Sequence, residues 1–344
     1  MKRLIVGDKT LIKLYPQAFN IAKGVNFNTK NFKLSQSLFR ELATRTEFGA
    51  SKKLAKEKAI NEHKDLCSKE GRAFNLTDVR LPGIYSHSTF KNYLQVGGRF
   101  LEYLDREDLT AKNITRAVER YGLDYLRDME DRGLSPYTVL QAKAFMGKII
   151  NKEMDYKIRL EKDPTKGRSE SVRTRTFRED LNKDLVTIAK GTGGRRGDLE
   201  RLTTKDFVRR GDVCVGIEFK GSKGGRDRYA PILPKYQKEI TKIVIDRELQ
   251  GKDRVFDAVN SHANIHSYRR LYCQELYREC VSDKQYRDSL INLYKSRDKE
   301  MSGRNKEGDY NTRDGRSFDR QSLFIASQAL GHNRLDVIPK SYFK

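Results

Sequence analysis

Apolar positions recur with a helical period through the first half of the chain. From residue 50 to 69, lysine and glutamate alternate around isolated apolar residues, which predicts an exposed helix. Between residues 87 and 153, three successive apolar stripes predict three more helices. The first is expected to be capped by Ser88 or Thr89, and the third begins after Ser135, which suits a cap because proline takes the first helical position. The pattern therefore predicts a small all-helical module.

The pattern changes in the last part of the chain. Apolar and polar residues alternate from 213 to 219 and again from 229 to 233, with glycines between the two segments. This alternation predicts a β-hairpin within an otherwise helical region. A polar stretch at residues 154–175 precedes that region and has little apolar periodicity, so we interpret it as a linker.

These elements predict a multidomain, mainly α protein with a small β-sheet or hairpin. A chain of 344 residues is too long for one ordinary hydrophobic core, so two or three domains are expected. We place four parts along it: a basic helical region at 1–85, the helical module at 86–153, the linker at 154–175 and a mixed α/β domain at 176–344.

The charge of the chain narrows the class of partner. Its 70 basic and 47 acidic residues give a formal net charge of +23. Such an excess attracts polyanions, and nucleic acid is the leading candidate because each neutralised phosphate releases a condensed counterion. The alternative is a basic surface that only keeps the protein dissolved.

Other classes of protein are disfavoured by the composition. No apolar run approaches the roughly 20 residues that span a membrane, and the first residues lack the apolar stretch of a secretory signal. Four scattered cysteines do not have the spacing of a zinc site. We therefore expect a cytoplasmic protein that contacts no membrane and needs no metal or other cofactor.

Two basic motifs open the last region. The segment TGGRRGDLERL, residues 192–202, places Arg195 and Asp198 at the start of a helix. The segment FKGSKGGR, the turn of the predicted hairpin, presents Lys220 and, as a less favoured alternative, Lys223. Taken alone, the first motif is also typical of a helix start with surface arginines, and the second of a solvated turn.

Two histidine motifs follow. His266 and Arg269 have the spacing HxxR, which places both on one face of a helix. Leu330-Gly-His332 ends a predicted helix, because glycine suits the left-handed cap at a helix C-terminus. Tyr342 comes shortly afterwards, and Pro339 disfavours a regular helix just before it.

In this order the motifs resemble those of the tyrosine recombinases, the integrase-like family that includes the Xer recombinases. They are similar to the family's TGxRxxEL box, its GKGNKxR turn, its HxxR and LGH boxes and its tyrosine nucleophile. The resemblance covers 176–344 and, more loosely, 86–153, where GLSPYTV resembles a helix start in the family's core-binding domain. It implies a core-binding domain and a catalytic domain there. With Asp198 in a supporting role, it implies these catalytic residues: Arg195, Lys220, His266, Arg269, His332 and Tyr342.

Such side chains suit attack on a DNA phosphodiester. Arginines grip the non-bridging oxygens in bidentate geometry, and histidines donate hydrogen bonds or move the proton of the nucleophile. Lysine can protonate the 5′ oxygen as it leaves. A cationic pocket is needed because the reference pKa of tyrosine is about 10. The resemblance implies a 3′-phosphotyrosyl intermediate that is rejoined without metal or ATP.

The resemblance also implies partners. Double-stranded DNA is the expected substrate, a homotetramer assembled on DNA is the expected active form, and accessory DNA-bending or excision factors are further candidates. We interpret the chain as a site-specific recombinase, an integrase of a mobile element, whose residues 1–85 bind accessory DNA sites. The alternatives are a type IB topoisomerase, which uses similar residues to relax supercoils, and a DNA-binding relative without catalysis.

Two features depart from the family's pattern. The segment between the HxxR and LGH boxes is long, and its excess is expected within 278–316, either as an exposed insertion or as a disordered loop. Only two residues follow Tyr342, whereas many relatives carry a longer tail that packs on a neighbouring protomer. Two other tyrosines are rival nucleophiles in principle, but both precede the LGH box: Tyr294 and Tyr310.

Overall fold

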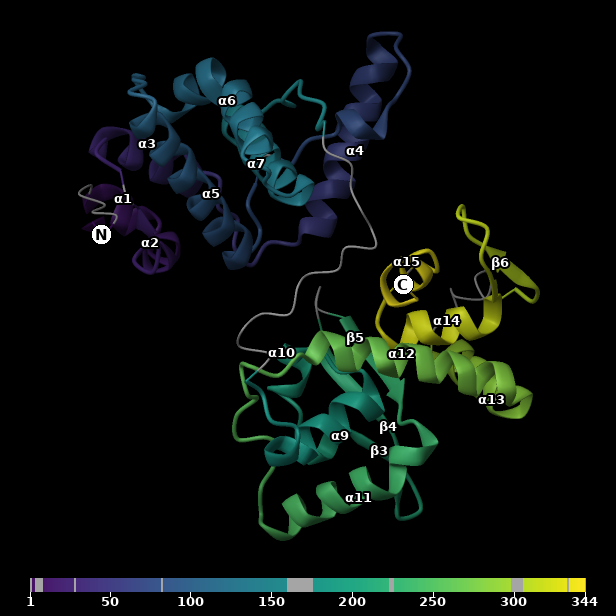
Figure 1. Cartoon of the computed structure of the whole chain (residues 1–344). Helices are drawn as coiled ribbons and strands as arrows, with labels where there is room; N and C mark the ends of the chain where they lie inside the picture. The colour runs from purple at the N-terminus through teal and green to yellow at the C-terminus, as the bar shows by residue number, and fades with distance from the viewer. Residues whose placement is uncertain are drawn as a thin grey trace. The chain divides into compact units, whose positions relative to one another are not determined.

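The computed structural model describes residues 2–3, 9–27, 29–81, 83–159, 176–222, 226–297, 306–332 and 334–343. The chain divides into two compact units, Met1–Asp163 and Pro164–Lys344 (Figure 1). Each unit has hydrophobic clusters of its own. Helices dominate both units, and the second contains a small antiparallel sheet, so the predicted fold class is confirmed.

The first unit is built from helices. Helices α5, α6 and α7 confirm the three that were predicted between residues 87 and 153, and α4 confirms the helix predicted at 50–69. Strands β1 and β2 form a short antiparallel pair. In chain order the elements are β1 (Lys2–Arg3), α1 (Lys9–Leu14), α2 (Pro16–Ala22), β2 (Asn26–Phe27), α3 (Phe32–Ala43), α4 (Lys52–Lys69), η1 (Leu76–Asp78), α5 (His87–Arg106), α6 (Ile114–Asp131) and α7 (Pro136–Ile150).

Helix α5 begins slightly earlier than predicted. Its N-cap is Ser86, whose hydroxyl oxygen accepts a hydrogen bond from the backbone N of Thr89 at 3.2 Å. Ser88 and Thr89 therefore lie in the first turn, and the prediction that one of them caps the helix is wrong. The reason is that Ser86 has the extended backbone of a cap, so its side chain reaches the unpaired N–H groups of the first turn.

A single core joins the two sides of residue 85. Leu38 and Phe39 of α3 are fully buried in the same cluster as Phe90 and Phe100 of α5. Met154, which follows α7, belongs to this cluster as well. The first helices therefore pack onto the helical module. The boundaries predicted at residues 85 and 153 therefore do not separate hydrophobic cores. That the regions on either side of them have different functions stays a prediction.

Helix α4 differs from its neighbours because it is almost entirely exposed. Among its residues, all of which the structure describes, Cys67 is the one that is buried. Even Leu54 is 64% exposed. Its lysines all lie on the exposed surface: Lys52, Lys53, Lys56, Lys58, Lys64 and Lys69. A helix with so little apolar contact is a solvated surface or a surface for a charged partner.

The second unit places helices around a three-stranded sheet. Helix α11 packs against β4 and α9, α14 packs against β5, and α12 packs against both α9 and α14 (Figure 1). In chain order the elements are η2 (Asp180–Asn182), α9 (Lys183–Thr192), α10 (Arg196–Leu199), η3 (Thr204–Asp206), β3 (Phe207–Arg210), β4 (Val213–Ser222), β5 (Arg226–Pro231), α11 (Pro234–Leu249), α12 (Ile265–Ser282), α13 (Lys284–Arg297), β6 (Asp309–Asn311), β7 (Ser317–Asp319), α14 (Arg320–Ala329) and α15 (Val337–Tyr342).

The sheet confirms the predicted hairpin and adds a strand to it. Strands β4 and β5 pair antiparallel, with Ile217 opposite Ala230, and the register is irregular between Phe219 and Ser222. Lys223, the alternative lysine, lies outside the described residues. Strand β3 completes the order β3-β4-β5. It was not predicted, because four residues that include two arginines show no clear alternation.

The region predicted as an insertion is largely ordered secondary structure. Residues 278–282 continue α12, α13 follows, and strands β6 and β7 form an antiparallel hairpin just before α14. Residues 298–305 lie outside the described part of the chain. This hairpin, together with α13, separates the helix of the HxxR box from the helix of the LGH box.

A short helix, α15, carries Tyr342, although Pro339 was expected to disfavour a regular helix there. That prediction is wrong because Pro339 is the third residue of α15. The first four N–H groups of a helix have no partner within it, so a proline in the first turn removes no helical hydrogen bond.

The cysteines of the chain are buried and free. They are Cys67, Cys214, Cys273 and Cys280. Within the described ranges, no cluster of histidine, cysteine and carboxylate side chains is placed to hold a metal ion. Nor does any helix in that part of the chain combine the length and the apolar character that crossing a membrane requires.

Candidate active site

Arg195 lies where α9 ends and α10 begins. Gly193 ends α9 in the left-handed conformation, with φ of 61°, and a Cβ at this position would come within 2.3 Å of the Tyr272 ring. Glycine is therefore required both by the backbone and by the neighbouring ring. Arg195 follows as the N-cap of α10, and its backbone N donates to Asp198 Oδ2 at 3.1 Å. Its side chain reaches the LGH segment, where Nη2 donates to the carbonyl oxygen of Leu330 at 2.9 Å.

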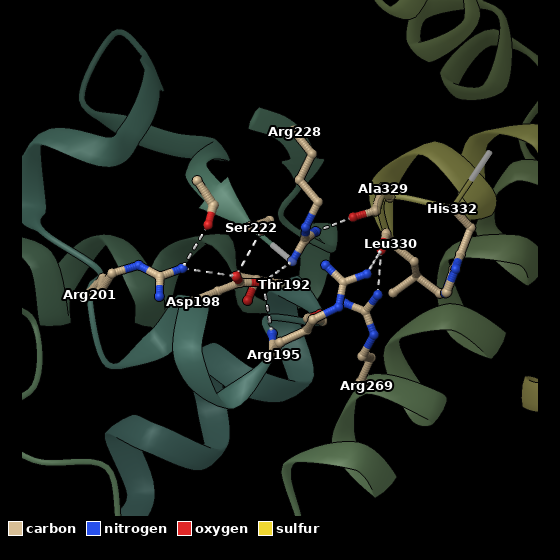
Figure 2. Close-up of polar contacts among 12 residues, drawn as sticks. Thr192, Arg195, Asp198, Arg201, Ser222, Arg228, Arg269, Ala329, Leu330 and His332 are labelled. Atoms are coloured by element: carbon tan, nitrogen blue, oxygen red, sulfur yellow. Dashed lines mark hydrogen bonds and ion pairs between the residues drawn. The ribbon is translucent and has the colours of Figure 1, made fainter. Parts of the chain in front are cut away.

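Arg269 reaches the same carbonyl from α12. Its side chain is 2% exposed, and its guanidinium donates to the carbonyl oxygens of Leu330 and Gly193. Its Nε donates to the hydroxyl oxygen of Tyr342 at 3.2 Å. Figure 2 shows Arg195 and Arg269 converging on Leu330. The LGH segment thus supplies one acceptor that holds the two guanidiniums together.

Tyr342 lies between the two histidine motifs. Its side chain is 3% exposed, and its hydroxyl oxygen is 3.1 Å from His332 Nε2. The ring of His266 is also close, with its centroid 6.3 Å from that of Tyr342. Gly331 makes this approach possible, because it leaves α14 with φ of 64°, the left-handed cap that was predicted. The hydroxyl therefore has both a guanidinium and an imidazole at hydrogen-bond distance.

Asp198 is held by an arginine that the sequence did not single out. Arg228 of β5 donates from Nη2 to Asp198 Oδ2 at 2.9 Å and from Nη1 to the carbonyl oxygen of Ala329. Its guanidinium also lies over the Phe219 ring, 4.2 Å from the centroid. Ser222 donates to the other carboxylate oxygen at 2.8 Å. Figure 2 shows Arg228 between Asp198 and Ala329, so this residue connects the arginine box to the LGH segment.

The signal that could have identified Arg228 is its place in the predicted hairpin. It precedes Tyr229 and Ala230 in a strand, and it stands opposite Phe219 in the register. Phe219 is apolar and buried, and a charged residue that pairs with it requires a partner of opposite charge. The register of the hairpin indicates this need, whereas the identity of the partner, Asp198, comes from the tertiary structure.

Burial and neighbouring charges shift the pKa values of these groups. Burial, and then repulsion by Arg269, lowers the pKa of Arg195. The same two causes lower the pKa of Arg228 to about 10. Burial by itself raises the pKa of Asp198, but the charge and hydrogen bond of Arg228 outweigh it, and the net pKa lies below the ordinary value. Guanidinium groups are permanent cations in proteins, and Asp198 is the carboxylate that faces them, so the cluster has a net positive charge.

Lys220 lies beside this cluster and contacts a different residue. Its side chain is 72% exposed, and its Nζ is 3.6 Å from Asp206 Oδ1. Together with Asp198 and Arg201 these residues line a pocket of about 300 Å³. The structure therefore brings together Arg195, Asp198, His266, Arg269, His332 and Tyr342, while it pairs Lys220 with Asp206. A catalytic role for Lys220 stays a prediction.

The rival tyrosines have other surroundings. Tyr294 is buried, its hydroxyl donates to the carbonyl oxygen of Tyr229 at 3.1 Å, and burial raises its pKa well above the ordinary value. Tyr310 lies in β6, opposite Phe318 of β7. Tyr294 is thus a core residue, and Tyr342 is the tyrosine that contacts the arginine and the histidine.

Comparison with known proteins finds similarity among solved structures. No sequence-family model and no curated protein sequence matches the chain. The chain is similar to the XerH site-specific recombinase bound to difH substrate in a pre-cleavage complex, with 16% identity over 96% of this chain and 91% of that chain and a TM-score of 0.42. It is similar to the Tn1549 transposon integrase in complex with transposon right end DNA, with 12% identity over 83% and 94% and a TM-score of 0.36. It is also similar to XerA recombinase, with 14% identity over 83% of this chain and 93% of that chain and a TM-score of 0.27.

Proposed function

We propose that the chain is a tyrosine-type site-specific recombinase that cuts and rejoins DNA strands through Tyr342. One observation carries this proposal: the Tyr342 hydroxyl lies 3.2 Å from Arg269 Nε and 3.1 Å from His332 Nε2. Arg195 joins Arg269 on the Leu330 carbonyl beside it. A buried phenol among permanent positive charges is suited to attack an anionic phosphodiester, because those charges stabilise both the ionised phenol and the substrate.

The reaction exchanges one phosphoester bond for another. The oxygen of Tyr342 bonds to phosphorus, and the bond from phosphorus to the 5′ oxygen breaks. His332 Nε2 lies at hydrogen-bond distance from the phenol, and we assign it as the base that accepts the phenol proton. We assign Lys220 as the acid that protonates the leaving 5′ oxygen. The phosphotyrosyl bond keeps the energy of the original ester, so attack by a 5′ hydroxyl rejoins the strand without ATP.

The arginines act on the charge of the phosphate. A guanidinium has five N–H donors, so the bonds of Arg195 and Arg269 to carbonyl oxygens leave further donors for the non-bridging oxygens. His266, whose ring approaches Tyr342, is positioned to add a hydrogen bond. Asp198 supports this arrangement through the backbone of Arg195. These cations supply the stabilisation that a metal gives in other phosphoryl-transfer sites.

The proposal extends to the partners of the chain. The formal charge of +23 suits double-stranded DNA, whose backbone both units are proposed to hold. Recombination exchanges strands between two duplexes, so we propose a homotetramer on DNA, with accessory DNA-bending or excision factors. The exposed lysines of α4 support a role for residues 1–85 in binding accessory DNA sites.

A covalent trap tests the proposal. The full chain is incubated with nicked duplexes that tile the DNA flanking its gene, because loss of the short strand beyond the nick makes cleavage irreversible. We expect a DNA adduct that survives denaturation, and peptide mapping should place it on Tyr342. Tyr342→Phe should form no adduct and should still bind the duplexes, since it keeps the ring and lacks only the hydroxyl.

Three results would contradict the proposal. Absence of any adduct from the unaltered chain would contradict the proposed strand cleavage. An adduct in Tyr342→Phe would contradict the assignment of Tyr342 as the nucleophile. Relaxation of supercoiled plasmids regardless of their sequence would indicate a topoisomerase instead. Two further variants, Arg195→Ala and Arg269→Ala, should lose cleavage and keep most duplex binding, because the net charge of +23 leaves many other cations to hold the DNA backbone.

A further inference from the structure

Phe343, the residue after Tyr342, is held between aromatic rings. The ring centroid of Phe343 lies 5.1 Å from that of Tyr277 and 5.2 Å from that of Phe318, and both contacts are edge-on. Tyr277 and Phe318 also contact each other, at 5.8 Å. Arg316 donates from Nη1 to the carbonyl oxygen of Phe343. We call Tyr277, Phe318 and Arg316 the Phe343 socket.

Two members of the socket come from the β6–β7 hairpin. Phe318 lies in β7, and Arg316 lies in the turn before it. The turn is closed by local bonds: the backbone N of Arg316 donates to Thr312 Oγ1 at 3.0 Å, and its Nη2 pairs with Asp314 at 2.8 Å. Gly315 supplies the positive φ of 81° that the turn needs. The hairpin therefore presents its two side chains to Phe343 from a defined turn.

The third member ties the hairpin to the helix that carries the HxxR motif. Tyr277 belongs to α12, and its hydroxyl oxygen accepts a hydrogen bond from the backbone N of Asp319 at 2.9 Å. From the same helix, Gln274 Nε2 donates to the carbonyl oxygen of Tyr342 at 2.7 Å. The backbone of Tyr342 and the side chain that follows it are thus both fixed relative to α12, which also carries Arg269.

We propose that the Phe343 socket is a positioning device for the nucleophile. Helix α15 has six residues, and a helix this short is not stable without tertiary contacts. Ile338 and Pro339, which precede Tyr342 in α15, are buried, and the socket holds the chain directly after Tyr342. The socket therefore keeps the Tyr342 hydroxyl against Arg269 and His332 before DNA is bound. The role of the socket in catalysis rests on the proposed function. Its role in holding residues 336–343 in place does not.

Hydrogen exchange of the DNA-free full chain tests the holding. In Phe343→Ala, amides of residues 336–343 should exchange faster by on the order of tenfold, because the aromatic contacts that oppose opening are lost. Phe318→Ala should give a similar increase. Phe343→Tyr, which keeps the ring, should remain near the unaltered rate. Ser341→Ala is the matched control, because this exposed residue lies on the same helix and outside the socket. Peptides from α12 and α14 should not change.

Strand cleavage tests the positioning. In single-turnover reactions on the nicked duplex, Phe343→Ala should lower the cleavage rate by on the order of tenfold or more, because the hydroxyl is no longer held at its reacting position. Affinity for the duplex should not change. The double variant with Phe318→Ala should be no slower than Phe343→Ala alone, because Phe318 holds the segment through the ring of Phe343.

The possible outcomes separate this proposal from the proposed function. Unchanged exchange in Phe343→Ala would overturn the socket, whatever the cleavage rate. Faster exchange with an unchanged cleavage rate would overturn its positioning role. If Phe343→Ala exchanges faster but the unaltered chain makes no DNA adduct, the socket holds the segment and the proposed recombinase function is contradicted.

Discussion

The three arginines of the site, of which Arg228 and Arg269 are buried and Arg195 is half-buried, differ in what they contact. Arg195 and Arg269 meet at the Leu330 carbonyl beside Tyr342, while Arg228 lies behind them against Asp198. Burying a guanidinium is costly unless a carboxylate is paired with it. Asp198 compensates Arg228 and at the same time accepts from the backbone N of Arg195. One carboxylate thus links the electrostatic balance of the core to the position of a proposed catalytic side chain.

Replacing Arg228 should therefore destabilise the second unit. We expect Arg228→Met to lower the free energy of unfolding by about 3–5 kcal/mol, because the Asp198 carboxylate stays buried without its partner. Adding Asp198→Asn should recover part of that loss, since an amide needs no counter-charge. Urea unfolding at neutral pH measures both values. An equal loss in the single and double variants would contradict the pairing.

The same pair predicts a dependence on pH. The pKa of Asp198 is below its ordinary value in the folded chain. Its contribution to stability is therefore fully present above the pKa of the unfolded carboxyl, and is lost as the pH falls through the folded pKa. The difference in stability between the unaltered chain and Asp198→Asn should shrink on acidification.

The two lysines of the hairpin can be separated by a leaving-group test. Lys220→Ala should slow cleavage by about 10²-fold or more if this lysine is the general acid. A substrate with sulfur in place of the bridging 5′ oxygen should restore the rate, because a thiolate leaves without a proton. Lys223→Ala is the matched control. If the sulfur substrate restores the cleavage rate of Lys223→Ala and not that of Lys220→Ala, Lys223 is the general acid.

At the scale of elements, Lys148 of α7 connects this helix to the segment before α5. Its Nζ donates to the carbonyl oxygens of Leu81 and Gly83, the second at 3.3 Å. Burial, and then repulsion by Arg45, lowers the pKa of Lys148 to about 8. A neutral amine keeps two N–H donors, enough for both carbonyls, so loss of the proton does not break the connection.

This pKa predicts how the stability of the first unit changes in alkaline solution. Between about pH 8 and the ordinary pKa of lysine, near 10.4, the unfolded chain keeps a proton that the folded chain has released. The unfolded state then binds more protons, so this residue makes stability rise with pH. Lys148→Met should abolish that rise, measured as the urea midpoint of the first unit across the window. The exposed Lys152→Met is the matched control, and an unchanged slope in Lys148→Met would disprove the assignment.

At the scale of the whole molecule, the hydrophobic clusters respect the division into two units. One cluster lies within residues 18–154, and the other two lie within 185–342. A compact body with its own core can fold alone. With both units bound to DNA, as proposed, each would raise the effective concentration of the other at the duplex.

Fragments test this organisation. Residues 1–163 and 164–344, produced separately, should each be helical and unfold cooperatively, which circular dichroism on heating measures. Each fragment should bind duplex DNA more weakly than the whole chain, and mixing them should not restore the affinity, because the covalent link is missing. A fragment that remains unfolded would show that its core depends on the other unit.

The sequence by itself determined part of the elements and the order of the candidate site residues. Apolar periodicity located α4, α5, α6, α7 and the β4–β5 hairpin, because these elements bury a stripe or a face whose spacing is set by the backbone. Spacing also placed His266 and Arg269 on one helix, and the preference of glycine for positive φ predicted the turn at Gly331. Local rules were less precise at helix ends, where the cap is Ser86 and where Pro339 lies in the first turn of α15.

The tertiary structure decided which of these residues meet. The convergence of Arg195 and Arg269 on Leu330, the pairing of Arg228 with Asp198 and the socket around Phe343 all join segments far apart in the chain. No periodicity encodes such contacts, because they depend on how helices and strands pack. The same holds for Lys220, which the family resemblance assigned to the site and which packing placed against Asp206. Sequence order thus identified the chemical groups, and packing determined their distances.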